Sequence, residues 1–237
     1  MSRLVITGHR GTLSTEPENT MRSFRRAIAD GVDELELDVH LSSDGHLVIM
    51  HDKTVDRTTN GTGAIAEMTL AELRALDAGL GEQVPTFEEF WRTIGEIDLQ
   101  VEVKDAAATA AVLALIKAEP REGVTITSFH PEAVAEAVAT EGPWRVGLIA
   151  GKGQEAKVAE HHTPDLALMV HWSLAETERV RAIRDAGGFV TVWPSRTPDE
   201  VTRALEEGWS GTTADDTAMA VRTRDEWEAA RAVRTGA

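Results

Sequence analysis

The 237-residue chain contains no cysteine. Disulfide bonds, thiol catalysis and thiolate metal sites are therefore excluded, and any bound metal must use oxygen or imidazole ligands. Tyrosine is also absent, so an aromatic cage for a quaternary ammonium group would have to use tryptophan or phenylalanine. No apolar run approaches membrane-spanning length, and residues 4–6 enter an apolar segment without the pattern of a signal peptide. We therefore expect a cytoplasmic protein without stable insertion into a membrane.

Basic residues are also scarce. The chain has 24 lysine and arginine residues against 40 acidic residues, which gives a formal net charge of −16 at pH 7. This charge disfavours non-specific binding to nucleic acid or to an anionic membrane. A ligand that carries phosphate would therefore need a local basic pocket. No feature of the sequence predicts an oligomeric state.

Short apolar segments alternate with amphipathic segments along the whole chain. This alternation predicts parallel strands joined by right-handed crossovers. The predicted strands cover residues 3–8, 33–41, 98–104, 124–128, 145–149, 165–170, 189–193 and 211–214. The predicted helices cover residues 21–30, 107–118, 131–140, 153–160, 175–186, 198–207 and 217–233. Eight such units predict an α/β fold, a (β/α)8 TIM barrel in one domain over residues 1–237, because such barrels typically have about 250 residues.

An open doubly wound sheet is the alternative to a barrel. A glycine-rich phosphate loop often follows the first strand of such sheets. Here His9-Arg10-Gly11 stands at that position instead, which favours the barrel.

One stretch breaks the alternation. Residues 44–95 contain a short strand at 46–50, a polar loop at 57–63 and two helical segments at 69–77 and 86–94. We interpret this stretch as a small insertion after the second strand. In a barrel it would lie over the C-terminal face, where catalytic residues gather.

Charged and apolar residues alternate along two of the predicted strands. Glu36 and Asp38 share one face of the second strand, and Glu102 and Lys104 share one face of the third, because successive side chains of a strand point to opposite faces. The charged faces must point into the barrel, where unpaired charge is costly. Three carboxylates suit a hard cation such as Mg²⁺ or Ca²⁺. The alternative is a structural ion network with Arg10 and Lys104, which leaves three carboxylates against two cations.

Other polar residues also stand where predicted strands end. His9 follows the first strand, His51 follows the short strand of the insertion, and Trp193 ends the seventh strand. Glu18 and Asn19 are candidates for supporting contacts in the first loop. Glu34 and Gln100 extend the polar faces toward the barrel floor, where we assign them no function.

Six strings of residues, in this order, resemble the glycerophosphodiester phosphodiesterase family, and the resemblance spans nearly the whole chain. These strings are His9-Arg10-Gly11, Pro17-Glu18-Asn19-Thr20, Glu36-Leu37-Asp38, His51-Asp52, Arg57-Thr58-Thr59-Asn60-Gly61-Thr62-Gly63 and Glu102-Val103-Lys104. The resemblance implies a barrel that hydrolyses small glycerophosphodiesters to sn-glycerol 3-phosphate and an alcohol with one divalent cation.

The resemblance also implies roles for individual residues. Carboxylates of the family that bind the metal match Glu36, Asp38 and Glu102. The acid/base pair matches His9 and His51, and the cations that contact phosphate match Arg10 and Lys104. Trp193 would form a wall of the substrate pocket. The family pattern leaves open which histidine is the acid, and whether water or a glycerol hydroxyl of the substrate is the nucleophile.

The chain departs from the family pattern at the rim of the expected pocket. Pro194-Ser195-Arg196 follows Trp193, and Ala214-Asp215 replaces a common Thr-Asp pair, so the leaving alcohol is not fixed by the resemblance. One alternative is a hydrolase of lysophospholipids or other phosphodiesters, which would need an exposed apolar rim. Another is a non-catalytic barrel that binds phosphodiesters.

Overall fold

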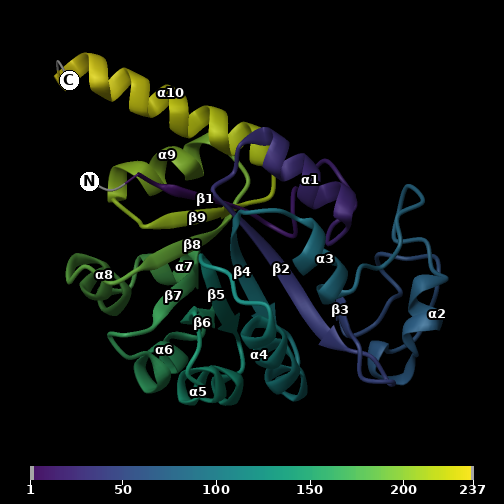
Figure 1. Cartoon of the computed structure of the whole chain (residues 1–237). Coiled ribbons are helices and arrows are strands. Elements are labelled where there is room, and N and C mark those ends of the chain that lie inside the picture. Colours follow the sequence, from purple (N-terminus) through teal and green to yellow (C-terminus); the bar gives the residue numbers. More distant parts are fainter. Residues whose placement is uncertain (1–2, 236–237) are drawn as a thin grey trace.

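The computed structural model describes residues 3–235 and contains a closed parallel barrel (Figure 1). The barrel closes because β1 pairs in parallel with both β9 and β2. Its eight strands are β1 (Val5–Gly8), β2 (Glu34–Leu41), β4 (Asp98–Val103), β5 (Val124–Ser128), β6 (Trp144–Ala150), β7 (Ala167–His171), β8 (Val190–Ser195) and β9 (Gly211–Ala214). One further strand, β3 (Leu47–Ile49), pairs antiparallel with the end of β2. The predicted TIM barrel with an extra strand after the second strand is confirmed.

The helices that follow the strands lie around the outside of the barrel (Figure 1). They are α1 (Met21–Asp30), α4 (Thr109–Ala118), α5 (Pro131–Ala139), α6 (Glu155–His161), α7 (Trp172–Ala175), α8 (Glu178–Asp185), α9 (Pro198–Glu207) and α10 (Thr217–Thr235). The short 3-10 helix η2 (Ala106–Ala108) precedes α4. The helix predicted at 175–186 corresponds to α8, and the short helix α7 before it was not predicted. The Thr177 side chain caps α8 by accepting a hydrogen bond from the Val180 N–H, which starts a new helix there.

The segment between β2 and β4 contains η1 (Ile65–Glu67), α2 (Leu70–Arg74) and α3 (Phe87–Thr93). The part before α3 has a small apolar core of its own, made of Val48, Met50, Val55, Ile65, Leu73, Ala78 and Val84. Phe87 and Phe90 of α3 instead belong to the main core, and the Phe90 ring centroid lies 4.7 Å from that of Phe24 in α1. The predicted insertion at 44–95 therefore includes a helix that packs on the barrel wall.

The two faces of β2 explain how the barrel positions its polar residues. Leu35, Leu37 and Val39 are fully buried in the core between the strands and the helices. The alternate residues of β2 point into the barrel, where the register places Asp38 beside Glu102 of β4. The sequence alternation therefore brings acidic side chains together at the C-terminal ends of neighbouring strands.

Candidate active site

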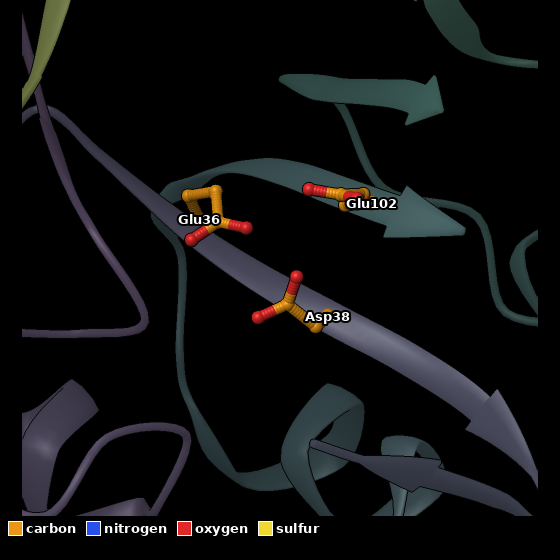
Figure 2. Close-up of side chains that lie close together, drawn as sticks. All are labelled: Glu36, Asp38 and Glu102. Atoms are coloured by element: carbon orange, nitrogen blue, oxygen red, sulfur yellow. The ribbon is translucent and has the colours of Figure 1, made fainter. Parts of the chain in front are cut away.

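Three buried carboxylates meet at the C-terminal ends of β2 and β4 (Figure 2). Glu36, Asp38 and Glu102 each offer an oxygen, and these oxygens all lie within 4.8 Å of one another. Burial raises the pKa of Glu36 well above its usual value, and the charges of Asp38 and Glu102 add to the effect. Burial and the Asp38 charge raise the pKa of Glu102 to about 7. Concentrated negative charge of this kind requires a compensating cation.

Two protein cations compensate part of this charge. Lys104 Nζ lies 2.7 Å from Glu102 Oε1 and 3.4 Å from Asp38 Oδ1, and Arg10 Nε lies 3.4 Å from Asp38 Oδ2. Burial alone would raise the pKa of Asp38, but Lys104 and Arg10 outweigh burial and lower it. Even so, the buried oxygens Asp38 Oδ1 and Glu102 Oε1 accept no hydrogen bond of acceptable geometry. These two buried oxygens have the Lys104 ion pairs as their polar contacts, and together with a third carboxylate they fit a hard divalent cation, which prefers oxygen ligands.

The backbone of Arg10 is held in an unusual conformation beside Glu36. Arg10 has a left-handed φ of 51°, which costs a non-glycine residue about 1 kcal/mol or more. In this conformation its N–H donates to Glu36 Oε2 at 2.9 Å, and its carbonyl accepts from Ser23 Oγ at 3.0 Å. A Cβ at Gly11 would lie only 2.3 Å from Ser23 Oγ. The string His9-Arg10-Gly11 is therefore required locally to aim the Arg10 N–H at a carboxylate.

His9 is oriented by a carboxylate from the last strand connection. Its Nδ1 lies 2.6 Å from Asp215 Oδ1, and Asp215 Oδ2 accepts a hydrogen bond from Arg196 Nε at 2.7 Å. Burial would raise the pKa of Asp215, but the hydrogen bonds from His9 and Arg196 lower it. Because an ionised carboxylate can only accept, Nδ1 carries a proton and Nε2 remains as the other ring nitrogen. Sequence analysis noted Asp215 and Arg196 only as departures at the rim, although Asp215 stands directly after a strand.

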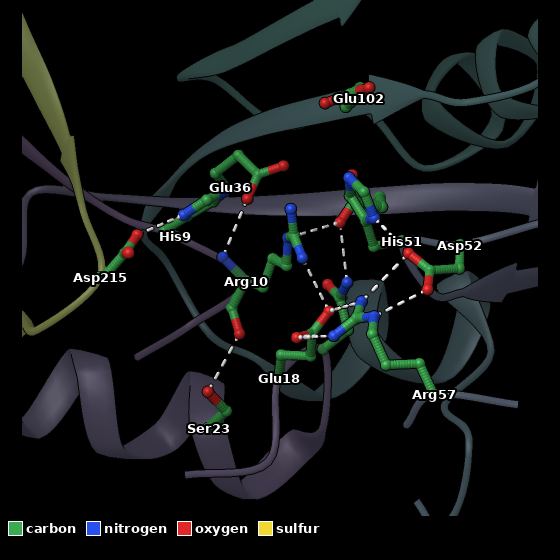
Figure 3. A network of polar contacts seen from close by, with 12 residues as sticks. His9, Arg10, Glu18, Ser23, Glu36, His51, Asp52, Arg57, Glu102 and Asp215 are labelled. Carbon is green, nitrogen blue, oxygen red and sulfur yellow. Dashed lines mark hydrogen bonds and ion pairs between the residues drawn. The ribbon is translucent and has the colours of Figure 1, made fainter. Parts of the chain in front are cut away.

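His51 has a matching arrangement on the other side of Arg10 in Figure 3. Its Nδ1 lies 2.6 Å from Asp52 Oδ1, and Asp52 Oδ2 accepts from Arg57 Nε at 2.7 Å. The Arg57 hydrogen bond lowers the pKa of Asp52. Burial lowers the pKa of His51 and favours its neutral form. Both histidines are thus held at Nδ1 by an aspartate that an arginine contacts in turn.

Arg57 also joins the two halves of the site (Figure 3). Its Nη1 donates to Glu18 Oε2 at 2.7 Å, while Glu18 Oε1 accepts from Arg10 Nη1 at 2.8 Å. The same loop supplies Asn19, whose Nδ2 donates to Asp38 Oδ2 at 2.8 Å. The sequence predicted supporting contacts for Glu18 and Asn19, but it offered Arg57 only as part of a family string and without a role, because residues 39 positions apart meet only in the fold.

A cavity of about 90 Å³ contains most of the predicted site residues. It is lined by His9, Arg10, Glu36, His51, Gln100, Glu102, Phe129, Ile149, Trp193 and Thr213. Gln100, which sequence analysis left without a function, lies on this cavity and has a buried, unpaired Oε1. A larger hollow of about 710 Å³ beside α8 contains none of the predicted site residues. The smaller cavity is therefore the candidate active site, because Glu36, Glu102 and both predicted histidines meet there.

Comparisons with known proteins show the family of the chain. The sequence model of the glycerophosphoryl diester phosphodiesterase family matches residues 9–219. A glycerophosphodiester phosphodiesterase from Caldanaerobacter subterraneus is 40% identical over 164 residues, which cover 63% of this chain and 67% of that protein. Another from Bacillus subtilis is 37% identical over 109 residues, which cover 40% of this chain and 37% of that protein.

A solved structure extends the likeness over the whole fold. The structure of a phosphodiesterase from Oleispira antarctica in complex with the product sn-glycerol-3-phosphate has a TM-score of 0.83 and 27% sequence identity. The match covers 93% of this chain and 96% of that chain. Fold and site together define the protein as a TIM-barrel phosphoric diester hydrolase. The chain belongs to the glycerophosphoryl diester phosphodiesterase family and is an enzyme of that family.

Among the described residues, no helix combines the length and apolar character needed to cross a bilayer.

Proposed function

We propose that the protein hydrolyses glycerophosphodiesters to sn-glycerol 3-phosphate and an alcohol, with one divalent cation and a pair of histidines. The observation that carries this proposal is the convergence of Glu36, Asp38 and Glu102 within 4.8 Å, in a cavity that His9 and His51 also line. The complex of the Oleispira antarctica phosphodiesterase with sn-glycerol-3-phosphate supports the same product here.

The three carboxylates would hold the divalent cation, Mg²⁺ or Ca²⁺. Their oxygens are of the type that both ions prefer, and two of them lack hydrogen bonds. When bound, the ion supplies Lewis-acid polarisation of the phosphodiester and offsets its negative charge. Asn19 helps to fix Asp38 by donating to its second oxygen.

Arg10 and Lys104 bind the phosphate oxygens in this proposal. Burial would lower the pKa of Lys104, but Asp38 and Glu102 outweigh burial and raise it, so the amine is charged at neutral pH. Arg10 is likewise kept protonated by Asp38, Glu36 and Glu18 against the effect of burial. Both cations are mostly buried, so their attraction for a phosphate is screened less than at a surface. Charge-assisted hydrogen bonds from these groups would orient the phosphodiester in the cavity.

His9 and His51 divide the proton transfers. One takes the proton from the attacking oxygen, and the other donates a proton to the leaving oxygen. Asp215 and Asp52 hold the Nδ1 atoms, so Nε2 of each ring exchanges the proton. The same pair serves either a water or a glycerol hydroxyl of the substrate as nucleophile. Retention of both histidines with all three carboxylates argues against a non-catalytic barrel.

The surface around the insertion favours a small substrate over a lysophospholipid. Leu73 and Phe87 are buried, and Leu70 and Leu76 pack against the small core of the insertion. Among the described residues of this segment, Leu80 is the large apolar side chain that stands exposed, at 72%. A single leucine is too small a patch to bind an acyl chain.

The test is release of sn-glycerol 3-phosphate from glycerophosphoethanolamine with Mg²⁺, with Ca²⁺ or with EDTA. We expect activity with one or both ions and none with EDTA. His9→Ala should lose about 100- to 10,000-fold in kcat while its circular dichroism spectrum is unchanged. Activity that survives EDTA would reject the metal, and wild-type turnover by His9→Ala would reject its proton transfer.

A further inference from the structure

Phe129 and Trp193 form an aromatic wall of the cavity. Phe129 follows β5 and Trp193 stands in β8, and behind them His171 at the end of β7 contacts Trp193 while Lys157 of α6 contacts Phe129. We call these four residues the rim subsite. The Trp193 ring meets Phe129 edge-on at 5.9 Å between centroids and His171 at 5.4 Å. The rings therefore make edge-to-face contacts and do not stack face to face.

The face of Phe129 is already close to two protein cations. Lys157 Nζ lies 5.0 Å from the ring centroid and Lys104 Nζ lies 5.7 Å from it, both within cation–π distance. Lys157 Nζ also donates to the Phe129 carbonyl at 2.9 Å, which fixes the amine beside the ring. A quaternary ammonium group would have to approach this ring against two like charges. The ring is therefore unsuited to the cationic head of choline.

Lys157 forms no close ion pair among the described residues, although burial lowers the pKa of its amine and the more distant charges of Glu102 and Glu132 oppose that shift. Among residues 3–235, no carboxylate forms an ion pair with Lys157 within 4.0 Å. Besides burial, the cations Lys152 and Arg196 lower the pKa of His171, so positive charge surrounds the rim on more than one side. Trp193 adds a hydrogen-bond donor, because its Nε1 is buried and has no partner. A cation without a close ion pair and an unpaired donor both favour a ligand rich in acceptor oxygens.

We propose that the rim subsite binds the leaving-alcohol part of the substrate and selects alcohols that carry an anionic group over alcohols that carry a quaternary ammonium group. The inference rests on the proposed function, because it takes the phosphodiester to be held by Arg10 and Lys104. The alcohol is the half that differs among glycerophosphodiesters. Lys157 is only partly buried, and its amine lies beside the ring of Phe129, which does line the cavity. A phosphorylated polyol is the class of leaving alcohol that fits.

The experiment compares kcat/KM for glycerophosphoinositol 4-phosphate and for glycerophosphocholine in the wild type and in Lys157→Gln. The quantity of interest is the ratio of the two values. The intrinsic reactivity of each leaving alcohol cancels when this ratio is compared between proteins. We expect the wild type to prefer the anionic substrate and Lys157→Gln to reduce the ratio by about 10-fold, as for loss of one close charge.

Two further variants serve as controls. Lys117 also has its amine over an aromatic ring, 6.0 Å from the Trp144 centroid, but Trp144 does not line the cavity, whereas the ring beside Lys157 does. Lys117→Gln should therefore keep the wild-type ratio. Lys157→Arg, which preserves the charge, should keep most of the preference and shows that charge rather than side-chain shape is responsible.

The possible failures are distinguishable. An equal fall of kcat/KM for both substrates in Lys157→Gln would assign Lys157 to the shared half of the substrate and overturn the selection. An unchanged ratio in Lys157→Gln would overturn the subsite while leaving the proposed function intact. Release of sn-glycerol 3-phosphate from neither substrate, with Mg²⁺ or Ca²⁺ present, would overturn the proposed function and the subsite together.

Discussion

The barrel interior contains three buried acidic residues on β2, and the one nearest the floor differs from the other two. Glu34, near the barrel floor, accepts a hydrogen bond from Thr7 Oγ1 at 2.7 Å and has no ion pair among the described residues. Burial raises its pKa to about 7, although the Thr7 hydrogen bond acts in the opposite direction. Asp38, nearer the C-terminal end of the same strand, converges with Glu36 and Glu102. It contacts the cations Arg10 and Lys104.

The difference shows what turns a buried carboxylate into a site. Glu34 has a hydrogen-bond donor in Thr7 and is partly protonated near neutral pH, so it needs no bound ion. The upper cluster sets three carboxylates against two cations, and two of its buried oxygens accept no hydrogen bond of acceptable geometry. Alternation along the strand places both groups inside the barrel, but only convergence at the strand ends creates a place for an ion. Four predictions test this contrast, in order of decreasing effect.

Asp38→Asn should have the largest effect. It removes one carboxylate and the counter-charge for Arg10 and Lys104, so kcat/KM should fall by about 1,000-fold or more, since a metal site supplies several kcal/mol of stabilisation. Glu34→Gln should stay within about 3-fold of the wild type, because it lies outside the cluster. Steady-state release of sn-glycerol 3-phosphate measures both. Comparable losses of kcat/KM in the two variants would contradict the contrast between Glu34 and the carboxylate cluster.

Asp215→Asn should come next. It keeps the shape beside His9 but no longer requires Nδ1 to carry the proton, so kcat should fall by about 100-fold with little change in KM. The neighbouring Asp216 caps α10 by accepting from the Met219 N–H at 2.9 Å, which makes Asp216→Asn a matched control. The control should leave kcat near its wild-type value. If both variants lose activity equally, the effect is on folding and not on His9.

Arg57→Gln should have a moderate effect, because Arg57 acts through Glu18 and Asp52 and does not line the cavity. We expect a loss of about 10-fold in kcat/KM, and less than additive losses when Glu18→Gln is added, since the two residues share one network. Arg74→Gln removes a surface ion pair to Glu89 in the same segment and is the control. Strict additivity of Arg57→Gln and Glu18→Gln would contradict a shared network.

The smallest effect concerns stability. Because the folded-state pKa of Glu34 is raised to about 7, the folded protein holds this proton more tightly than the unfolded chain does. Stability is therefore lost as pH rises from the unfolded pKa toward 7, and the full penalty is present above 7. Glu34→Gln should remove this penalty and raise the free energy of unfolding by about 1–3 kcal/mol at pH 8.

At pH 4.5 the benefit of Glu34→Gln should be smaller, since much of the wild-type side chain is then protonated in both states. Urea unfolding at the two pH values measures the difference. A variant that is less stable than the wild type at pH 8 would show that the ionised form of Glu34 is the favoured one in the folded barrel.

The fold could be predicted from sequence because its signals are local and periodic. Glu36 and Asp38 alternate with Leu35 and Leu37, which indicates a strand with one polar face, and eight such segments indicate a barrel. The short helix α7 was not predicted because its four residues are too few to show a helical period. The wall role of α3 was missed because it depends on contact with Phe24, far away in the sequence.

The geometry of the site was predictable only where residues share a strand or a motif. Glu102 could be placed near Asp38 because parallel strands align their ends. Asp215 is one acid after a strand, with no pattern to link it to His9 at a distance of 206 positions. Arg57 likewise has no periodic signal for its contacts with Glu18 and Asp52. Such contacts follow from the tertiary fold and not from sequence spacing.

The most direct test of the central claim is titration calorimetry of Ca²⁺ and Mg²⁺ into the wild type, Glu34→Gln and Asp38→Asn. We predict one ion bound per chain for the wild type and for Glu34→Gln, and a loss of that binding in Asp38→Asn. Binding that is the same in all three proteins would contradict the claim that the converging carboxylates at the strand ends form the ion site.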